Sequence, residues 1–180
     1  FYSSTHVFKD QMPDIKGMHL AIVGVADDSG SARNKGAAKA PDEIRRKLYQ
    51  LKKGTGSYRI ADLGNLRNGP GLEESHLRLK EVCAHLISRE VVPVVLGGTH
   101  DYAFGQYAAY ESLDKLVTLL NVDAFLDIED RNSGVTSDNH LHKVLLYEPN
   151  YLFNLYHLAH QSYLIDNKAL AVLEKLYFEA

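Results

Sequence analysis

Two short segments of this chain end an apolar run with side chains that commonly bind metal ions. The segment LGGTHDY contains His100 and Asp101, and the segment NVDAFLDIED contains Asp123 and Asp127. Imidazole and carboxylate donors without a thiolate favour Mn, Zn or Fe, and sets rich in carboxylates favour Mn or Mg. The residue types and their spacing therefore raise the hypothesis of a metal site.

These side chains can meet only if the preceding strands deliver them to one edge of a sheet. In an open α/β sheet, ligands bind beyond the carboxyl ends of the strands. His100 and Asp123 would converge if their two strands were neighbours. A lone histidine after a glycine pair is also typical of a turn, and Asp-x-x-x-Asp is also typical of a helix cap or a solvated loop. The spacing alone leaves both interpretations open.

Buried strands and amphipathic helices alternate along the chain, which predicts an α/β fold with a mostly parallel sheet and helices on both faces. Pro93 predicts a short or locally irregular third strand. The segment 132–139 has the composition of a loop. We expect strands at 18–25, 58–66, 91–98, 116–124 and near 161–165, and helices at 40–51, 71–90, 101–115, shortly after Pro149 and at 168–180.

The composition is typical of a globular protein and excludes several functional classes. The 180 residues suit one domain, with 45% hydrophobic and 24% charged residues and a formal net charge of -3. Without a basic stripe, an apolar run of membrane-spanning length or a signal-peptide pattern, we expect no nucleic-acid or membrane partner. The only cysteine, Cys83, lies on an apolar helical stripe and fits a reducing cytoplasm, which is the expected location.

Other catalytic motifs find little support. The segment 97–105 (GGTHDYAFG) lacks the spacing of a phosphate-binding loop, and the chain has no G-x-S-x-G or H-E-x-x-H motif. The residues after the first strand, ADDSGS, lack the glycine fingerprint of a dinucleotide site, and the pair Asp27 and Asp28 is typical of a solvated turn. Tyr156 and His157 lie in an amphipathic aromatic stretch and are expected in the core or an interface.

Several segments, in the right order, resemble the ureohydrolase superfamily of arginase, agmatinase and formimidoylglutamase. VVPVVLGGTHDY resembles the Gly-Gly-Asp-His-Ser strand end of that family, and NVDAFLDIED resembles its Asp-Ala-His-x-Asp strand end. NSGVTSDNHLHKVL occupies the place of its substrate loop. The resemblance, closest to formimidoylglutamase-like proteins, implies an arginase-like three-layer α/β/α fold. Residues 1–180 would then be a single domain that lacks its C-terminal part.

The resemblance also implies ligands. His100, Asp123 and Asp127 match positions that bind one manganese ion, and the aspartate at Asp123 also bridges to a second ion. Phe125 stands where the family has a histidine ligand for that second ion. The later Ser-x-Asp-x-Asp motif has no match before Ala180. The expected cofactor is therefore Mn²⁺, as one ion rather than two.

The sequence departs from the family pattern at two further residues, and one assignment in the substrate loop stays open. Thr99 replaces the usual Asp and Asp101 the usual Ser of the first strand-end motif. The family places a proton-shuttling histidine in the substrate loop, and either His140 or His142 fits this position.

Two functions follow from the resemblance. The first is a metal-dependent hydrolase that cleaves the C–N bond of a linear amidine or guanidino substrate with metal-activated water. The second is a ureohydrolase fold that has lost catalysis and serves as a binding or structural subunit, because Phe125 offers no lone pair to a metal. In either case the resemblance implies a homo-oligomer.

Overall fold

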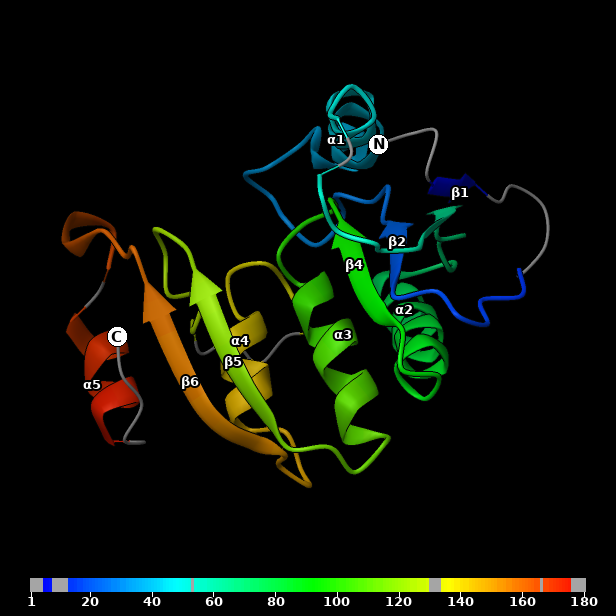
Figure 1. Cartoon of the computed structure of the whole chain (residues 1–180). Helices are drawn as coiled ribbons and strands as arrows, with labels where there is room; N and C mark the ends of the chain where they lie inside the picture. The colour runs from blue at the N-terminus through cyan, green and yellow to red at the C-terminus, as the bar shows by residue number, and fades with distance from the viewer. Residues whose placement is uncertain (1–4, 8–12, 53, 130–133, 166, 176–180) are drawn as a thin grey trace.

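The computed structural model describes residues 5–7, 13–52, 54–129, 134–165 and 167–175, and its strands form two parallel sheets (Figure 1). The four-stranded sheet has the order β1 (Thr5–Val7), β3 (Ile60–Asn65), β2 (Leu20–Gly24), β4 (Val92–Leu96). The two-stranded sheet pairs β5 (Val117–Val122) with β6 (Leu152–Leu158).

Within the described residues, five α-helices and two short 3-10 helices connect and flank these strands. Their bounds are η2 Ala37–Lys39, α1 Ala40–Leu48, α2 Leu72–Ile87, α3 Tyr102–Glu111, α4 His140–Leu145, η3 Ser162–Leu164 and α5 Asn167–Lys175. No helix in these described ranges is long and apolar enough to cross a membrane.

The core of the larger sheet follows from its apolar pattern. Ala21 and Val23 of β2 are buried because β2 is an inner strand, between β3 and β4, and its side chains pack in the core cluster with those of α2. On α2, Leu79, Cys83 and Leu86 are fully buried against it, which confirms the predicted apolar stripe and the packing role of the cysteine.

The order of the strands places helices on both faces of the larger sheet. The crossover through α1 runs from β2 to β3, and the crossover through α2 runs back from β3 to β4. Right-handed crossovers in opposite directions put α1 and α2 on opposite faces. Figure 1 shows α2, α3 and α4 in a row, in agreement with their mutual packing.

The smaller sheet is covered on one face only among the described residues. Leu155 packs with helices α4 and α5 in a second apolar cluster. The opposite face presents Leu120, Val122 and Leu158, whose side chains are more than half exposed. β4 and β5 do not pair, so the sheet that we expected to be continuous is two sheets.

Most predicted elements are confirmed, and two are wrong. A strand, β6, occupies the region after Pro149 where we expected a short helix, and the strand expected near 161–165 is the 3-10 helix η3. The alternation of buried and exposed residues in β6 has the period of a half-buried strand. Of the two effects expected from Pro93, the short strand is confirmed, since β4 has five residues where 91–98 was expected. The register of β4 against β2 is regular, and Pro93 is tolerated because β4 is an edge strand.

The ends of two predicted segments lie outside the described residues. Helix α5 is described to Lys175, and 176–180 are outside that range. Of the loop expected at 132–139, residues 134–139 contain no helix or strand, as predicted, and 132–133 are not among the described residues.

Candidate metal centre

His100, Asp123 and Asp127 lie together at the carboxyl ends of β4 and β5. The Nδ1 atom of His100 is 3.0 Å from Oδ2 of Asp123 and 2.9 Å from Oδ2 of Asp127. One ligand atom from each residue lies within 4.8 Å of the others. The predicted convergence therefore occurs even though β4 and β5 belong to separate sheets.

Unusual backbone conformations present these side chains. Gly97 and Gly98, with φ of 70° and 71°, turn the chain sharply between β4 and His100. Asp127 has φ of 48°, a left-handed conformation that is uncommon outside glycine and is often found at functional sites. The backbone of the loop after β5 is thus locally strained at Asp127, the residue whose carboxylate contacts His100.

A buried histidine of β6 supports Asp123. The Nε2–H group of His157 donates to the backbone carbonyl of Asp123 at 3.1 Å, and the side-chain amide of Asn121 donates to Nδ1 at 3.0 Å. Burial lowers the pKa of His157 and so favours the neutral ring that these two bonds require. The sequence placed His157 in the core, which is confirmed, but its role beneath Asp123 was missed.

The neighbouring carboxylates change the pKa of His100, the histidine of the cluster. The hydrogen bond to Asp127 raises the pKa of His100, partial burial opposes this, and the charges of Asp127 and Asp123 raise it further. The two carboxylates thus favour the protonated form of the His100 imidazole. A divalent cation would take over the same electrostatic role.

Of the two histidines that the sequence left open, His140 lies beside the cluster. Its Nδ1 atom is 3.7 Å from Oδ2 of Asp127, and its ring centroid is 6.0 Å from that of His100. Burial lowers the pKa of His140. No described contact joins His142 to the cluster, and its Nδ1 atom is buried without a hydrogen-bond partner among the described residues.

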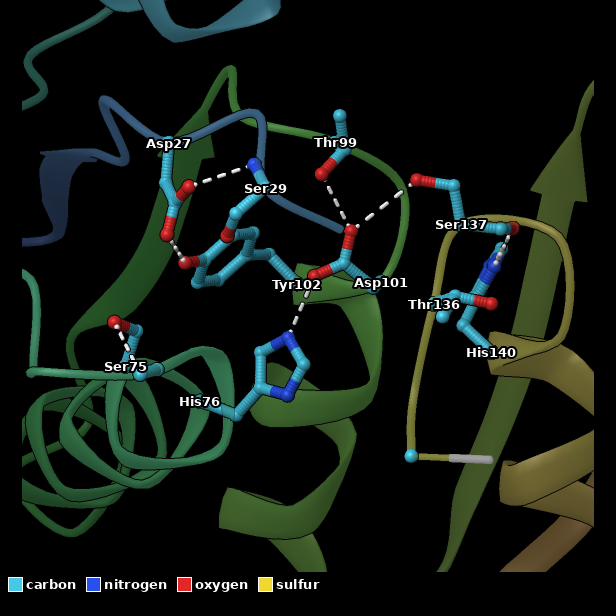
Figure 2. A network of polar contacts seen from close by, with 12 residues as sticks. Asp27, Ser29, Ser75, His76, Thr99, Asp101, Tyr102, Thr136, Ser137 and His140 are labelled. Atoms are coloured by element: carbon cyan, nitrogen blue, oxygen red, sulfur yellow. Dashed lines mark hydrogen bonds and ion pairs between the residues drawn. The ribbon is translucent and has the colours of Figure 1, made fainter. Parts of the chain in front are cut away.

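The two residues that flank His100 do not join the cluster. The Asp101 carboxylate is fully buried and accepts hydrogen bonds from Thr99 and His76 (Figure 2). Asp101 was a candidate for the cluster because it follows the same strand end, but its side chain points to α2 instead.

A cavity of about 660 Å³ adjoins the cluster. His100, Phe125 and Asp127 form part of its wall, with Arg33 and Lys168 contributing cationic side chains. Phe125 is 41% exposed, so its ring faces this space instead of packing into the core. A small polar molecule that entered the cavity would therefore lie close to His100.

The donor set of the cluster fits a manganese ion. One imidazole and two carboxylates, with no thiolate, match the ligand preferences of Mn²⁺. The three ligand atoms already face one another, and the raised pKa of His100 shows that the two carboxylates stabilise positive charge at this place. Three protein ligands leave positions for water or substrate.

Comparison with known proteins identifies the family. Residues 18–172 match the model of the Arginase family. The chain belongs to the arginase family. Its curated relatives include a formimidoylglutamase of Citrobacter koseri, 36% identical over 124 residues, and one of Clostridium tetani, 34% identical over 141 residues. These alignments cover 64% and 72% of this chain but only 39% and 42% of the relatives, so the chain spans about two fifths of their length.

Solved structures of the arginase family share the fold. The formimidoylglutamase of Bacillus subtilis superposes with a TM-score of 0.83 at 19% identity, covering 97% of this chain and 57% of that one. A Trypanosoma cruzi formiminoglutamase crystallised with Mn²⁺ gives 0.82 at 21% identity, covering 90% of this chain and 59% of that one. The predicted arginase-like α/β fold is confirmed, and the chain contains part of it.

Proposed function

We propose that this chain carries part of the active site of a manganese-dependent hydrolase that cleaves the C–N bond of a linear amidine, as a formimidoylglutamase does. The observation that carries the proposal is the convergence of His100, Asp123 and Asp127 beside a cavity of substrate size. The curated relatives named formimidoylglutamase and the Mn²⁺ in the Trypanosoma cruzi structure support the reaction and the metal.

In this proposal His100, Asp123 and Asp127 hold the ion. When bound, manganese supplies Lewis-acid activation of water for attack on a trigonal carbon. His157 keeps Asp123 in place through the carbonyl bond. The cavity wall formed by Arg33, Phe125 and Lys168 orients the substrate next to the ion.

His140 is the residue that we propose to move a proton. A carbonyl oxygen only accepts, so the 3.0 Å bond to the Ser137 carbonyl places a hydrogen on Nδ1 of His140. The neutral ring, which burial favours, then has a free lone pair on Nε2. An unprotonated imidazole nitrogen is the kind of group that serves as a general base near neutral pH.

Calorimetric titration with MnCl₂ tests the metal site. We expect saturable binding of about one ion per chain, lost in His100→Ala, because the variant removes the only nitrogen ligand. The protein in its natural full length, loaded with manganese, is then assayed on formiminoglutamate and related amidines. Absence of manganese binding, or of turnover on all these substrates, would refute the proposal.

A second function is favoured by one residue. Phe125 places a ring without a lone pair beside the three ligands, where the family has a histidine. In a two-metal hydrolase both ions acidify the attacking water, so the loss of one ligand weakens that effect. Under this alternative the chain is part of a binding or structural subunit that retains the fold and a single ion.

A further inference from the structure

The buried carboxylate of Asp101 is the centre of a polar network that the proposed hydrolysis does not use. It accepts hydrogen bonds from Nε2 of His76 at 2.6 Å, from Oγ1 of Thr99 at 2.5 Å and from Oγ of Ser137 at 3.2 Å (Figure 2). The three donors come from α2, from the turn after β4 and from the loop 134–139. One side chain therefore joins three separate parts of the chain.

The loop 26–36 packs on the same carboxylate. A Cβ atom on Gly30 would lie 2.1 Å from Oδ1 of Asp101, so only glycine allows this approach. The carbonyl of Gly30 also accepts the amide of Ser137 at 2.9 Å. Next to Asp101, the hydroxyl of Tyr102 donates to Asp27 at 2.6 Å. The loops 26–36 and 134–139 are thus fixed to each other above Asp101.

Both loops form walls of the cavity beside the metal ligands. Ser31, Arg33 and Asn34 come from the first loop, and Ser137 and Asp138 from the second. A buried carboxylate is costly to desolvate and is retained only when its partners compensate that cost. An apolar side chain would fill this core position, but it would leave Ser137 without its acceptor.

We infer that Asp101 is a positioning residue, which fixes the two loops that line the cavity and so sets the affinity for substrate. This inference rests on the proposed function, because it takes the cavity as the substrate site. Asp101 contacts neither the ion nor the substrate in this scheme. It acts through Ser137 and Gly30, on a part of the cavity wall that includes Arg33.

Two substitutions of Asp101 distinguish the loss of its hydrogen bonds from the loss of its negative charge. Asp101→Ala removes the acceptor of all three bonds. Asp101→Asn retains an oxygen for Thr99 and Ser137, and its amide group can donate to the other tautomer of His76. We expect Asp101→Ala to raise KM for the amidine substrate about tenfold with a smaller change in kcat, and Asp101→Asn to restore most of the affinity.

A second buried aspartate provides the matched control. Asp62 in β3 is 1% exposed and accepts hydrogen bonds from Arg45, and neither residue lines the cavity. Asp62→Ala lowers stability but should leave KM unchanged. An equal rise of KM in Asp62→Ala, or an unchanged KM in Asp101→Ala, would overturn the inference. In either case KM would not depend on how Asp101 positions the two loops.

Hydrogen exchange tests the loops independently of turnover. In Asp101→Ala and in Ser137→Ala, the backbone amide of residue 137 should exchange faster, while the amides of β2 keep their protection. If Asp101→Ala does not fold, Ser137→Ala supplies the same readout. If the wild type has no activity, the proposed hydrolysis fails while faster exchange still supports the positioning role. Unchanged exchange of residue 137 in both variants would overturn it.

Discussion

The raised pKa of His100 has a direct consequence for metal binding. Manganese binds the neutral imidazole, so a proton on His100 competes with the ion. Because Asp127 and Asp123 raise the pKa, the competition begins at a higher pH than for an ordinary histidine. We expect the affinity to fall as pH decreases through this raised pKa, by up to about tenfold per pH unit for one displaced proton.

Titrations with manganese from about pH 6 to about pH 8.5, the range around the histidine pKa, measure this dependence. His85 on α2 provides the control, because it lies outside the cluster and its pKa is lowered by partial burial and by the neighbouring Arg89. His85→Gln should leave the pH dependence of manganese affinity unchanged. An affinity that stays constant with pH would show that His100 is not a ligand.

Phe125 is the residue that separates the two candidate functions. Its ring lines the cavity beside Asp127, so an imidazole at this position would add a nitrogen to the existing ligands. We expect Phe125→His to increase the number of bound manganese ions, or to tighten binding where the count stays at one. Phe125→Leu is the matched control, because it shortens the side chain without adding a lone pair.

Equilibrium dialysis followed by metal analysis gives the stoichiometry for both variants. The same change should increase amidine turnover in the full-length protein if the second ligand position limits catalysis. Identical metal content and affinity in Phe125→His, Phe125→Leu and the wild type would contradict the role assigned to this residue.

At the scale of elements, the ion pair between Arg45 and Asp62 joins helix α1 to strand β3. The guanidinium of Arg45 contacts both carboxylate oxygens of Asp62, with Nε at 2.9 Å and Nη2 at 3.0 Å. Asp62 is almost fully buried, and Tyr49 donates to it as well. Removing the cation would therefore leave a buried charge with too few partners.

We expect Arg45→Met to lower the free energy of unfolding by about 3–5 kcal/mol, as for other broken buried pairs. Arg46 provides the control: it pairs with Glu43 on the exposed side of the same helix, and Arg46→Met should cost less than about 1 kcal/mol. Urea unfolding followed by circular dichroism measures both. Equal losses in the two variants would show that the burial of Asp62 is not decisive.

Helices and strands were predicted correctly from the sequence where one hydrophobic pattern was clear along the whole segment. β2 reads as a continuous apolar run because it is buried on both faces, and α2 shows a regular apolar stripe. A helix was predicted in place of β6, whereas pairing with β5 and the open face of that sheet determine its conformation.

The candidate site was predictable only in part. His100, Asp123 and Asp127 follow apolar strands, and this local signal raised the hypothesis of a metal site. It did not separate them from a turn or a helix cap, and the family resemblance was needed to select these three residues. The contact between His76 and Asp101 joins residues 25 positions apart on different elements. Asp101 departs from the family motif at its position, and His76 belongs to no motif that the sequence analysis identified. Such contacts depend on how α2 and α3 pack, which no local pattern in one sequence reveals.

At the scale of the whole molecule, the uncovered face of the smaller sheet is the most conspicuous feature. Leu120, Val122 and Leu158 lie side by side on β5 and β6, and no described helix covers them. Contiguous exposed apolar residues on a sheet favour association. The occupant that this chain can supply is a second copy of itself, in line with the homo-oligomer that the family resemblance implies.

We expect the chain to self-associate at micromolar concentration and Leu120→Lys to shift it toward the monomer, because the ammonium would be costly to bury between two apolar faces. Leu77→Lys is the matched control, since Leu77 is an exposed leucine of α2 outside this face. Light scattering coupled to size exclusion measures the mass of each. A monomeric wild type, or equal dissociation in both variants, would show that this face does not bind a second copy. Association lost only in Leu120→Lys would assign the interface to β5 and β6, on the side of the sheet opposite α4 and α5.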